Sequence, residues 1–312
     1  MELVRGLNSV SKALRGCVLT VGNYDGVHLG HQQMIRTLKE RSSELRVPST
    51  VLVFEPSSKE FIDPDAAPAR LTRWREKFAA LAALEVDRMV TLSFNERMRA
   101  MSPDDFVDQL IVRGLGARHV VVGDDFRYGC KACGTIDSLE AAGRVRGFGV
   151  DQVEPFVLDG VRVSSTAVRE RLEHADYSGA ARFLGRPYRM VGHVAYGKGL
   201  GRTLGFPTAN LHLMRRKSPT WGVIAVRVHG IDARPRDGVA SLGTRPTVNG
   251  VEPLLEVHVF HFRGDLYGRL IEVEFIAKLR DEVKFDSVDA MVAQMKVDAA
   301  NARELLSKVT GG

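Results

Sequence analysis

Two histidines and three glycines occur within ten residues, in the stretch GNYDGVHLGH that runs from Gly22 to His31. His28 and His31 are three positions apart, so both imidazoles can face the same bound group. An apolar run over residues 17–21 precedes the stretch, and residues 32–43 have the spacing of an amphipathic helix. We therefore expect a strand, a glycine-rich turn and a helix N-terminus, whose backbone N–H groups and dipole together bind anions.

This arrangement favours the binding and activation of a nucleotide phosphate. Glycines let the backbone approach a phosphate closely, and imidazoles can stabilise the negative charge that develops on it. The alternative is a pair of ordinary loop histidines beside a turn, and the combination with the glycines favours the nucleotide site. The candidate nucleotide-binding residues of this stretch, besides the two histidines, are Gly22, Asp25, Gly26 and Gly30.

A second glycine-rich stretch, GKGLGRTLGFPTAN, covers residues 197–210. It is not a dinucleotide fingerprint, because no helix can continue through Phe206 and Pro207. It is not a Walker A loop either, because no serine or threonine follows Lys198. We interpret it as an independent phosphate loop of another type, with Gly197, Lys198, Gly199, Gly201 and Gly205 as its candidate nucleotide-binding residues.

Two further segments are candidates for the first nucleotide site. Ser164 and Ser165 open a predicted helix, and Arg169 lies one turn into it, where it could reach a triphosphate. Serines at a helix start are caps in any case. The loop 123–129 follows a predicted strand, at the end where open α/β sheets bind ligands. Taken alone it is as consistent with a solvated turn as with a site; its candidate residues are Asp125, Phe126 and Arg127.

The predicted strand 254–262 alternates in polarity, so Glu256 and His258 share one face and His261 points the other way. The two histidines are therefore a poor metal pair, and Glu256 is either an exposed rim residue or a functional carboxylate.

Cys130 and Cys133 form a C-x-x-C pair, but a zinc site would need histidines to complete it. Two loop cysteines without a role are the simpler interpretation.

The order of the predicted elements indicates two domains. The first half alternates strands with helices, which is typical of a parallel sheet with crossover connections. After the predicted helix 177–184, strands dominate and favour a small antiparallel barrel, closed by a helix that begins near 286–289. We place the boundary near Gly185, giving an α/β domain over 1–184 and a mainly β domain over 185–312. The predicted strands are 17–21, 49–54, 89–92, 119–122, 189–196, 222–228, 239–242, 254–262 and 270–276, and the other predicted helices are 73–84 and one that begins at Ser102.

The composition is that of an ordinary soluble protein, with 312 residues of which 44% are hydrophobic and 26% charged. No apolar run is long enough for a membrane span, and the N-terminus lacks the apolar core of a secretory signal. Three cysteines are too few for a disulfide framework, so we expect a reducing cytoplasm. The net charge of +6 is spread without a basic stripe, which favours nucleotides over nucleic acid as partners.

The motifs resemble those of one family. H-x-G-H is similar to the signature of adenylyl-transferring α/β enzymes, and its longer form resembles the bacterial bifunctional riboflavin kinase/FAD synthetases. The 197–210 loop is similar to the riboflavin kinase loop of that family. Further matches follow in the same order: 123–129, 163–169, 243–247, 256–258, 266–268 and 279–285.

The resemblance implies two reactions, with riboflavin, FMN, FAD and ATP as substrates and products and Mg²⁺ as cofactor. In the second domain it implies Glu256 as the general base, Thr208 and Asn210 at the metal, and Arg280, Glu282 and Phe285 near the flavin. In the first domain it implies that His28, His31 and the 164–169 segment grip ATP while the 123–129 loop lies along the flavin. The implied fold is a nucleotidyltransferase-like parallel-sheet domain followed by a small riboflavin-kinase barrel with a C-terminal helix.

The sequence departs from the family pattern at four places, of which the last three leave alternatives open. Tyr24 replaces a usual Phe, which is a mild change, Ser57 replaces a usual His and Ile224 a usual Tyr. The 130–135 segment differs from the basic and small residues that usually lead to a Gly-Asp. One alternative is a divergent member that has lost one activity and acts as a monofunctional enzyme or as a flavin- or nucleotide-binding regulator. Another is an adenylyltransferase for a different substrate. A nucleic-acid binder rests on net charge alone and would need strongly salt-dependent binding.

Overall fold

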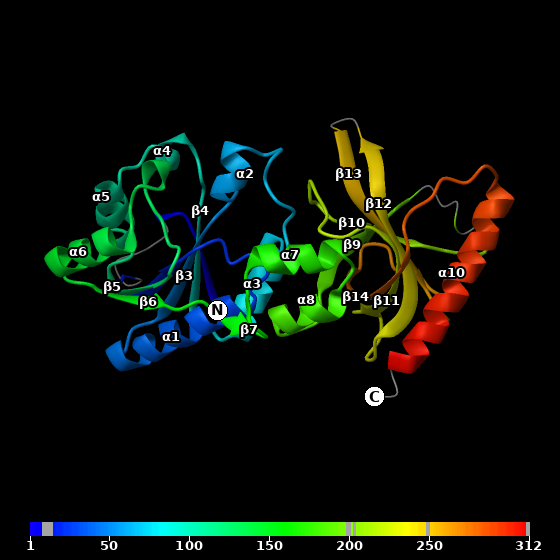
Figure 1. The fold of residues 1–312 in the computed structure, drawn as a ribbon, viewed down its shortest axis with the longest axis horizontal. Helices are drawn as coiled ribbons and strands as arrows, with labels where there is room; N and C mark the ends of the chain where they lie inside the picture. Colours follow the sequence, from blue (N-terminus) through cyan, green and yellow to red (C-terminus); the bar gives the residue numbers. More distant parts are fainter. Residues whose placement is uncertain (8–14, 198–200, 202–203, 248–249, 310–312) are drawn as a thin grey trace. The chain divides into compact units, whose positions relative to one another are not determined.

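The structure is a computed structural model that describes residues 1–7, 15–197, 201, 204–247 and 250–309 (Figure 1). The chain forms two compact units. The first contains Met1–Pro68 and Trp74–Ser164, and the second contains Ala69–Arg73 and Ser165–Gly312. The described residues include no helix that is both long and apolar enough to cross a membrane.

The first unit is built on a parallel sheet of six strands in the order β1-β4-β3-β2-β5-β6. The strands are β1 (Glu2–Arg5), β2 (Cys17–Val21), β3 (Ser49–Phe54), β4 (Arg88–Leu92), β5 (Ala117–Gly123) and β6 (Gly149–Val153). The predicted parallel sheet is thereby confirmed. The edge strands β1 and β6 were not among the predicted strands.

Helices connect these strands and cover both faces of the sheet. They are α1 (Leu29–Leu45), α2 (Ser58–Ile62), α3 (Trp74–Ala83), α4 (Glu96–Arg99), α5 (Pro103–Asp105), the π-helix η3 (Phe106–Val112), the 3₁₀ turn η4 (Cys130–Ala132) and α6 (Ile136–Arg146). A short hairpin of β7 (Val157–Leu158) and β8 (Val161–Arg162) ends the unit. The predicted helix start at Ser102 is confirmed, but the helix continues as a π-helix after Asp105.

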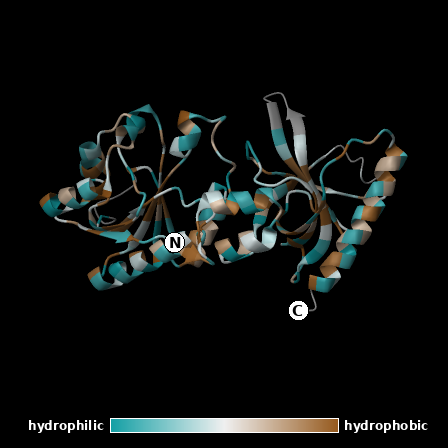
Figure 2. Ribbon diagram, viewed as in Figure 1, coloured by the Kyte–Doolittle hydropathy of each residue, from teal (hydrophilic) through white to brown (hydrophobic). Residues whose placement is uncertain are grey.

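The strands form because apolar side chains are buried on both faces of the sheet. Leu19 and Leu52 belong to the core cluster that contains Phe106 of η3. Their neighbours on the opposite face belong to a second cluster, which contains Ile35 and Leu38 of α1. Figure 2 shows hydrophobic residues concentrated along these strands.

The strand order reverses at β2. Its sequence neighbour β3 lies on one side, and β5 lies on the other side. In open α/β sheets, ligands bind outside the carboxyl ends of the strands at such a switch point. The two loops that leave β2 and β5, residues 22–31 and 123–129, are two of the three segments that the sequence analysis selected for the first site.

The second unit is a closed antiparallel barrel in the order β10-β13-β12-β11-β14-β9. Its strands are β9 (Arg189–Ala195), β10 (Ala209–His212), β11 (Gly222–His229), β12 (Arg236–Thr247), β13 (Gly250–Val259) and β14 (Leu270–Arg280). The predicted barrel is confirmed, and β10 is a strand that the sequence did not indicate. Because β13 ends at Val259, His261 lies in a turn with φ 52°, so its expected place on the opposite face of a strand was wrong.

Among its described residues, the second unit contains the helices α7 (Ser165–Glu173), α8 (Tyr177–Leu184) and α10 (Val288–Val309). Tyr177 of α8 packs on Phe275 of β14 with ring centroids 5.8 Å apart, and its hydroxyl hydrogen-bonds with that of Thr220 at 2.8 Å. The predicted C-terminal helix is confirmed, and Figure 2 shows alternating hydrophobic and hydrophilic bands along it.

The short segment Ala69–Arg73 also belongs to the second unit, although residues of the first unit flank it on both sides. Its carbonyl groups accept hydrogen bonds from three later residues. Arg169 Nε donates to the Ala69 oxygen at 2.6 Å, Arg215 Nη1 to the Arg70 oxygen at 2.6 Å, and the Tyr188 hydroxyl to the Leu71 oxygen at 3.4 Å.

Candidate active sites

The histidines of the first unit lie at the start of α1. His28 is the N-cap, and its Nδ1 accepts a hydrogen bond from the backbone N–H of His31 at 3.4 Å. The two imidazoles are stacked with centroids 3.7 Å apart, and the Tyr24 ring lies 4.8 Å from that of His31. The prediction that both histidines can face one group agrees with this stacking at a helix N-terminus.

The loop before α1 has an unusual backbone. Tyr24, Gly26 and Val27 have φ values of 48°, 87° and 45°, although neither Tyr24 nor Val27 is a glycine. A β-branched residue in this conformation costs on the order of 1–3 kcal/mol and persists only where its surroundings enforce it. Here they do: Gln32 Nε2 donates to the Val27 oxygen at 3.0 Å.

The side chain of Tyr24 fixes the loop that precedes α1 to the core of the sheet. Its side chain is fully buried, and its hydroxyl shares a 2.6 Å hydrogen bond with that of Thr20. Burial raises the pKa of Tyr24 well above its usual range, so the phenol stays protonated and keeps this bond. The phenol that replaces the family's usual Phe therefore has a structural role.

Two glycines of the loop allow close approaches. A Cβ on Gly30 would lie 3.2 Å from the Val163 oxygen and 3.3 Å from the His28 ring, and a Cβ on Gly22 would lie 3.2 Å from the Tyr24 ring. The end of the 161–163 segment, which leads to Ser164, thus lies against the first turn of α1. Asp25 is half-buried in the same loop.

The loop after β5 is tied to the β7–β8 hairpin. Arg162 forms a two-pronged ion pair with Asp124, at 2.9 and 2.7 Å, and lies 3.5 Å from a carboxylate oxygen of Asp125. Phe126 stacks on Tyr128 with centroids 5.7 Å apart, and Arg127 donates to the Phe126 oxygen at 2.8 Å. Arg162 could not be selected from the sequence, because its partner Asp124 lies 38 positions away.

Ser165 and Arg169 of α7 belong to the second unit, so their expected place beside the histidines stays a prediction. Both are half-buried. Arg169 Nε donates a hydrogen bond to the Ala69 oxygen at 2.6 Å, which restrains the position of the guanidinium group.

In the barrel, Glu256 of β13 is paired with Asn210 of β10 on one side and with Ser241 of β12 on the other. Residues paired across antiparallel strands project from the same face. Glu256 is half-buried, whereas its neighbours along the strand, Leu255 and Val257, are buried in the barrel. The alternation predicted for Glu256 and His258 is therefore confirmed.

The candidate metal residues lie beside this face. A Cβ on Gly197 would come within 2.3 Å of the Asn210 side chain, and one on Gly201 within 3.4 Å of the Thr208 hydroxyl. The glycines thus leave room for these two polar groups. Gly205 has φ 81°, and Lys198 and Gly199 lie outside the described residues.

The loop before β10 is fastened to β13. His258 Nδ1 donates to the Pro207 oxygen at 2.9 Å, and the Phe206 ring packs against the His258 ring. His258 is therefore a positioning residue of this loop. Its role agrees with the expectation that it is no metal ligand.

The candidate flavin residues of the second unit are held by neighbours that the sequence analysis did not select. Asp298 of α10, which is buried, binds Arg280 through both carboxylate oxygens at distances of 2.7–3.2 Å, and the Arg280 guanidinium lies 5.7 Å from the Phe285 centroid. Glu282 accepts a hydrogen bond from Ser241 at 2.8 Å. An aspartate on the apolar face of a helix was the signal that could have identified Asp298.

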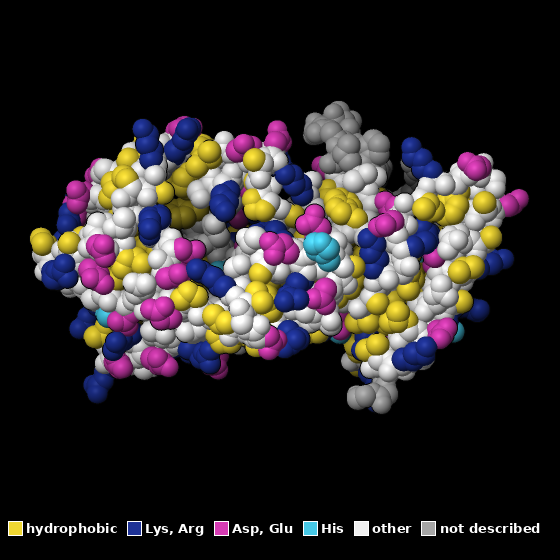
Figure 3. Space-filling view, in the orientation of Figure 1, with side chains coloured by type: hydrophobic (Ala, Val, Ile, Leu, Met, Phe, Trp, Pro, Cys, Tyr) yellow, Lys and Arg dark blue, Asp and Glu magenta, His cyan; other side chains and the backbone are white. Residues whose placement is uncertain are grey.

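Charged side chains of both signs are interspersed on the face shown in Figure 3. Among the described residues, no group of three or more His, Cys, Asp and Glu side chains could hold a metal ion. The candidate Mg²⁺ residues Thr208 and Asn210 are of other types.

Comparison with known proteins gives consistent results. The model of the FAD synthetase family matches residues 10–167, and that of the riboflavin kinase family matches residues 184–306. A bifunctional riboflavin kinase/FMN adenylyltransferase of Pseudomonas fluorescens is 49% identical over 307 residues, which are 98% of this chain and 98% of the relative. The protein of the same description from Escherichia coli K12 is 44% identical over 97% of both chains.

A solved structure has the same fold over nearly the whole chain. It is a crystal structure described as a macrolide-efflux protein from Streptococcus pneumoniae, with a TM-score of 0.78 and 28% sequence identity. The alignment covers 95% of this chain and 97% of that one.

Proposed function

Because this chain belongs to the family of bifunctional riboflavin kinase/FMN adenylyltransferases, we propose that it catalyses both reactions. ATP phosphorylates riboflavin to FMN with release of ADP, and a second ATP adenylylates FMN to FAD with release of pyrophosphate. The observation that carries the proposal is the match of both family models, in chain order, to the parallel-sheet and barrel regions of one chain. ATP as the co-substrate of both steps favours the cytoplasm as the place of action.

In the kinase reaction, Glu256 is the proposed general base. The ribityl 5′-hydroxyl is a poor nucleophile until a base accepts its proton. The half-buried carboxylate lies between Asn210 and Ser241 on one face of the barrel, where neighbouring strands fix its position. The proton moves from the hydroxyl to this carboxylate as the oxygen attacks the γ-phosphate of ATP.

The residues present fit a Mg²⁺ ion. Thr208 and Asn210 offer the oxygen donors that this ion prefers, and the missing Cβ atoms of Gly197 and Gly201 leave room for the two side chains. When bound, Mg²⁺ neutralises charge on the ATP phosphates. The proposed phosphate-binding loop consists of the described glycines Gly201 and Gly205, with Lys198 and Gly199 of the same stretch.

The adenylyl transfer is proposed to take place at the switch point of the parallel sheet. The FMN phosphate is already an anion, so the attack on the α-phosphate requires no general base. Charge develops on the α-phosphate oxygens and on pyrophosphate, where the α1 N-terminus, His28 and His31 can stabilise it. Ser164, Ser165 and Arg169 are the proposed triphosphate ligands, with Gly22, Asp25, Gly26 and Gly30 shaping the loop.

The flavin is proposed to bind at one loop of each unit. In the first unit this is the 123–129 loop with Asp125, Phe126 and Arg127, which the Arg162–Asp124 ion pair connects to the β7–β8 hairpin. In the second unit it is the region of Arg280, Glu282 and Phe285.

Two of the departures from the family pattern fit the local structure. Ser57 caps α2 and forms a capping box with Glu60. Ile224 is fully buried in the barrel. Both side chains therefore contribute to folding, which weakens the argument for a lost activity.

The test is direct. The protein is incubated with riboflavin, ATP and Mg²⁺, and FMN and FAD are separated by chromatography. We expect FMN first and FAD later, and neither product when Mg²⁺ is chelated. Formation of FMN without FAD would leave only the kinase, and formation of neither would refute the proposal.

A further inference from the structure

Cys130 and Cys133 border a four-residue turn. The Cys133 N–H donates to the Cys130 oxygen at 3.3 Å, and the two residues between them, Lys131 and Ala132, have φ values of 53° and 55°. Such a turn brings its first and last Cα atoms within about 7 Å, which overlaps the range of about 4.4–6.8 Å found in disulfides. The turn therefore holds the two cysteines close enough for a disulfide to be compatible with this backbone.

The side chains agree with this. The Cys133 thiol donates to the Cys130 carbonyl oxygen at 3.0 Å, so it is folded back over the turn. The nearby Cys133 side chain, together with desolvation, raises the pKa of Cys130. Cys133 is exposed and Cys130 half-buried, whereas Cys17 is buried with its pKa raised to about 11 by burial. A dissolved oxidant therefore reaches Cys133 first.

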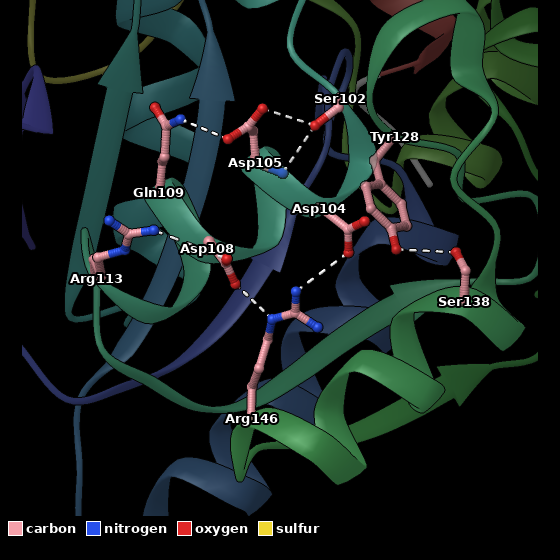
Figure 4. Close-up of polar contacts among 9 residues, drawn as sticks. All are labelled: Ser102, Asp104, Asp105, Asp108, Gln109, Arg113, Tyr128, Ser138 and Arg146. Atoms are coloured by element: carbon pink, nitrogen blue, oxygen red, sulfur yellow. Dashed lines mark hydrogen bonds and ion pairs between the residues drawn. The ribbon is translucent and has the colours of Figure 1, made fainter.

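The base of the turn is fixed. The Cys130 N–H donates to the Met101 oxygen at 2.7 Å, and Gly129 lies so close to Pro103 that a Cβ would come within 2.8 Å of its nitrogen. Figure 4 shows how this support is held: Ser102 caps α5 by accepting a hydrogen bond from the Asp105 N–H, and Arg146 of α6 pairs with Asp104 and Asp108.

The turn is also connected to the candidate flavin loop. Tyr128 and Gly134 form an antiparallel bridge around it, with N–H···O distances of 3.2 and 2.8 Å. The Tyr128 hydroxyl hydrogen-bonds with Ser138 at 2.9 Å (Figure 4), and its ring stacks on that of Phe126. The strained part of this hairpin is the turn between the cysteines, where two exposed non-glycine residues adopt a left-handed conformation that costs about 1–2 kcal/mol each.

We propose that Cys130 and Cys133 form a reversible disulfide by exchange with a small-molecule disulfide, which closes the turn next to the candidate flavin loop. The Cys133 thiolate attacks one sulfur of the small molecule, its S–S bond breaks, and one small thiol leaves. Cys130 then loses its proton to solvent and displaces the second small thiol from Cys133. Two protein thiols are oxidised, and one small-molecule disulfide is reduced to two thiols.

The disulfide removes open conformations of the turn, so the hairpin more often has the conformation described here. The effect on catalysis rests on the proposed function of the first unit. Because Phe126 then spends more time in one position, we expect the KM for FMN to fall by about threefold on oxidation. Riboflavin phosphorylation, which belongs to the other unit, should not change.

The disulfide is tested in the full-length protein without regard to activity. The protein is equilibrated in buffers of increasing oxidised-to-reduced glutathione ratio, quenched with acid, alkylated and digested. Mass spectrometry should find the peptide with both cysteines lighter by two hydrogen atoms, in the wild type and in Cys17→Ala. Cys133→Ser should yield no such species and only a glutathione adduct on Cys130.

Separate adducts on both cysteines, or unmodified thiols in the most oxidising buffer, would refute the disulfide. The KM for FMN is then measured on the oxidised and reduced samples. An unchanged KM in fully oxidised protein would refute the connection to the flavin loop. Failure of the reduced protein to form any FAD would instead refute the proposed function, and it would leave the disulfide measurement intact.

Discussion

At the residue scale, the stacked histidines at the α1 N-terminus should be separable by mutation. His28 caps the helix, whereas His31 lies in its first turn. We predict that His31→Ala lowers the rate of FAD formation by about 10²–10³, the usual cost of one preorganised transition-state contact, while FMN accumulates. His28→Ala should in addition lower the melting temperature, because a lost N-cap costs about 1 kcal/mol. Product chromatography and thermal melts measure the two effects, and an unchanged FAD rate would remove His31 from the mechanism.

Glu256 should be required for one reaction only. Glu256→Gln keeps the shape but removes the base, so we predict a loss of about 10²–10⁴ in riboflavin phosphorylation. FMN supplied directly should still become FAD at the normal rate. The matched control is Glu252→Gln, an exposed carboxylate on the same face of the same strand. If Glu256→Gln makes FMN normally, the base is another group, and if a folded variant loses both reactions, the two sites are not independent.

At the element scale, the Arg162–Asp124 ion pair joins the β7–β8 hairpin to the candidate flavin loop. Both side chains are partly exposed, so the pair contributes at most about 1 kcal/mol to stability. We predict that Arg162→Ala raises the KM for FMN by about fivefold or less and leaves riboflavin phosphorylation unchanged. Arg144→Ala, which breaks an exposed pair with Glu140, is the control. Equal KM values in the two variants would show that the hairpin does not position the loop.

Asp151 on β6 makes the first unit sensitive to acid. Burial opposes its ionisation, but its contacts with Arg41 and His119 hold its pKa below the ordinary value. The unfolded state then binds more protons in acid, so the stabilisation is complete above the unfolded pKa of about 4 and is lost as the pH falls below it. Asp151→Asn should therefore lose less stability than the wild type between pH 5 and pH 3, taken as about the range of that transition.

Urea unfolding followed by circular dichroism at each pH measures this difference. Glu154→Gln is the control, because Glu154 is an exposed carboxylate just after the same strand. If Asp151→Asn and the wild type lose equal stability on acidification, this ion pair does not determine the acid sensitivity.

The sequence predicted the central strands because their apolar runs are buried on both faces, as at Leu19 and Leu52. It missed β6, where Asp151 and Gln152 make an edge strand polar, and β10, which has only four residues. It selected the glycine loops from local composition. The positive φ of Val27 and the Arg162–Asp124 pair could not be predicted, because each depends on contacts that form only in the folded unit.

At the scale of the whole molecule, the proposed boundary near Gly185 can be tested with two fragments. Tyr177 and its neighbours in α8 pack on the barrel, and the contacts of the compact units change at Ser164 rather than at Gly185. We predict that fragments 165–312 and 185–312 both phosphorylate riboflavin, but that the longer one melts at a higher temperature. Loss of the buried Tyr177 side chain alone should cost about 3 kcal/mol or more. Equal melting temperatures would show that α8 does not stabilise the barrel.

During synthesis of the chain, the Ala69–Arg73 segment emerges long before the residues that bind its carbonyl groups. Its carbonyl groups accept hydrogen bonds from residues 100, 117 and 145 positions downstream. At translation rates of about 5–20 residues per second, a delay of a hundred residues corresponds to roughly 5–20 s. During that time the nascent parallel sheet can acquire its later strands β5 and β6, while a loop of its own chain remains hydrated. The peptide groups of this segment therefore find their partners only after the strands of the parallel sheet that follow it have been made.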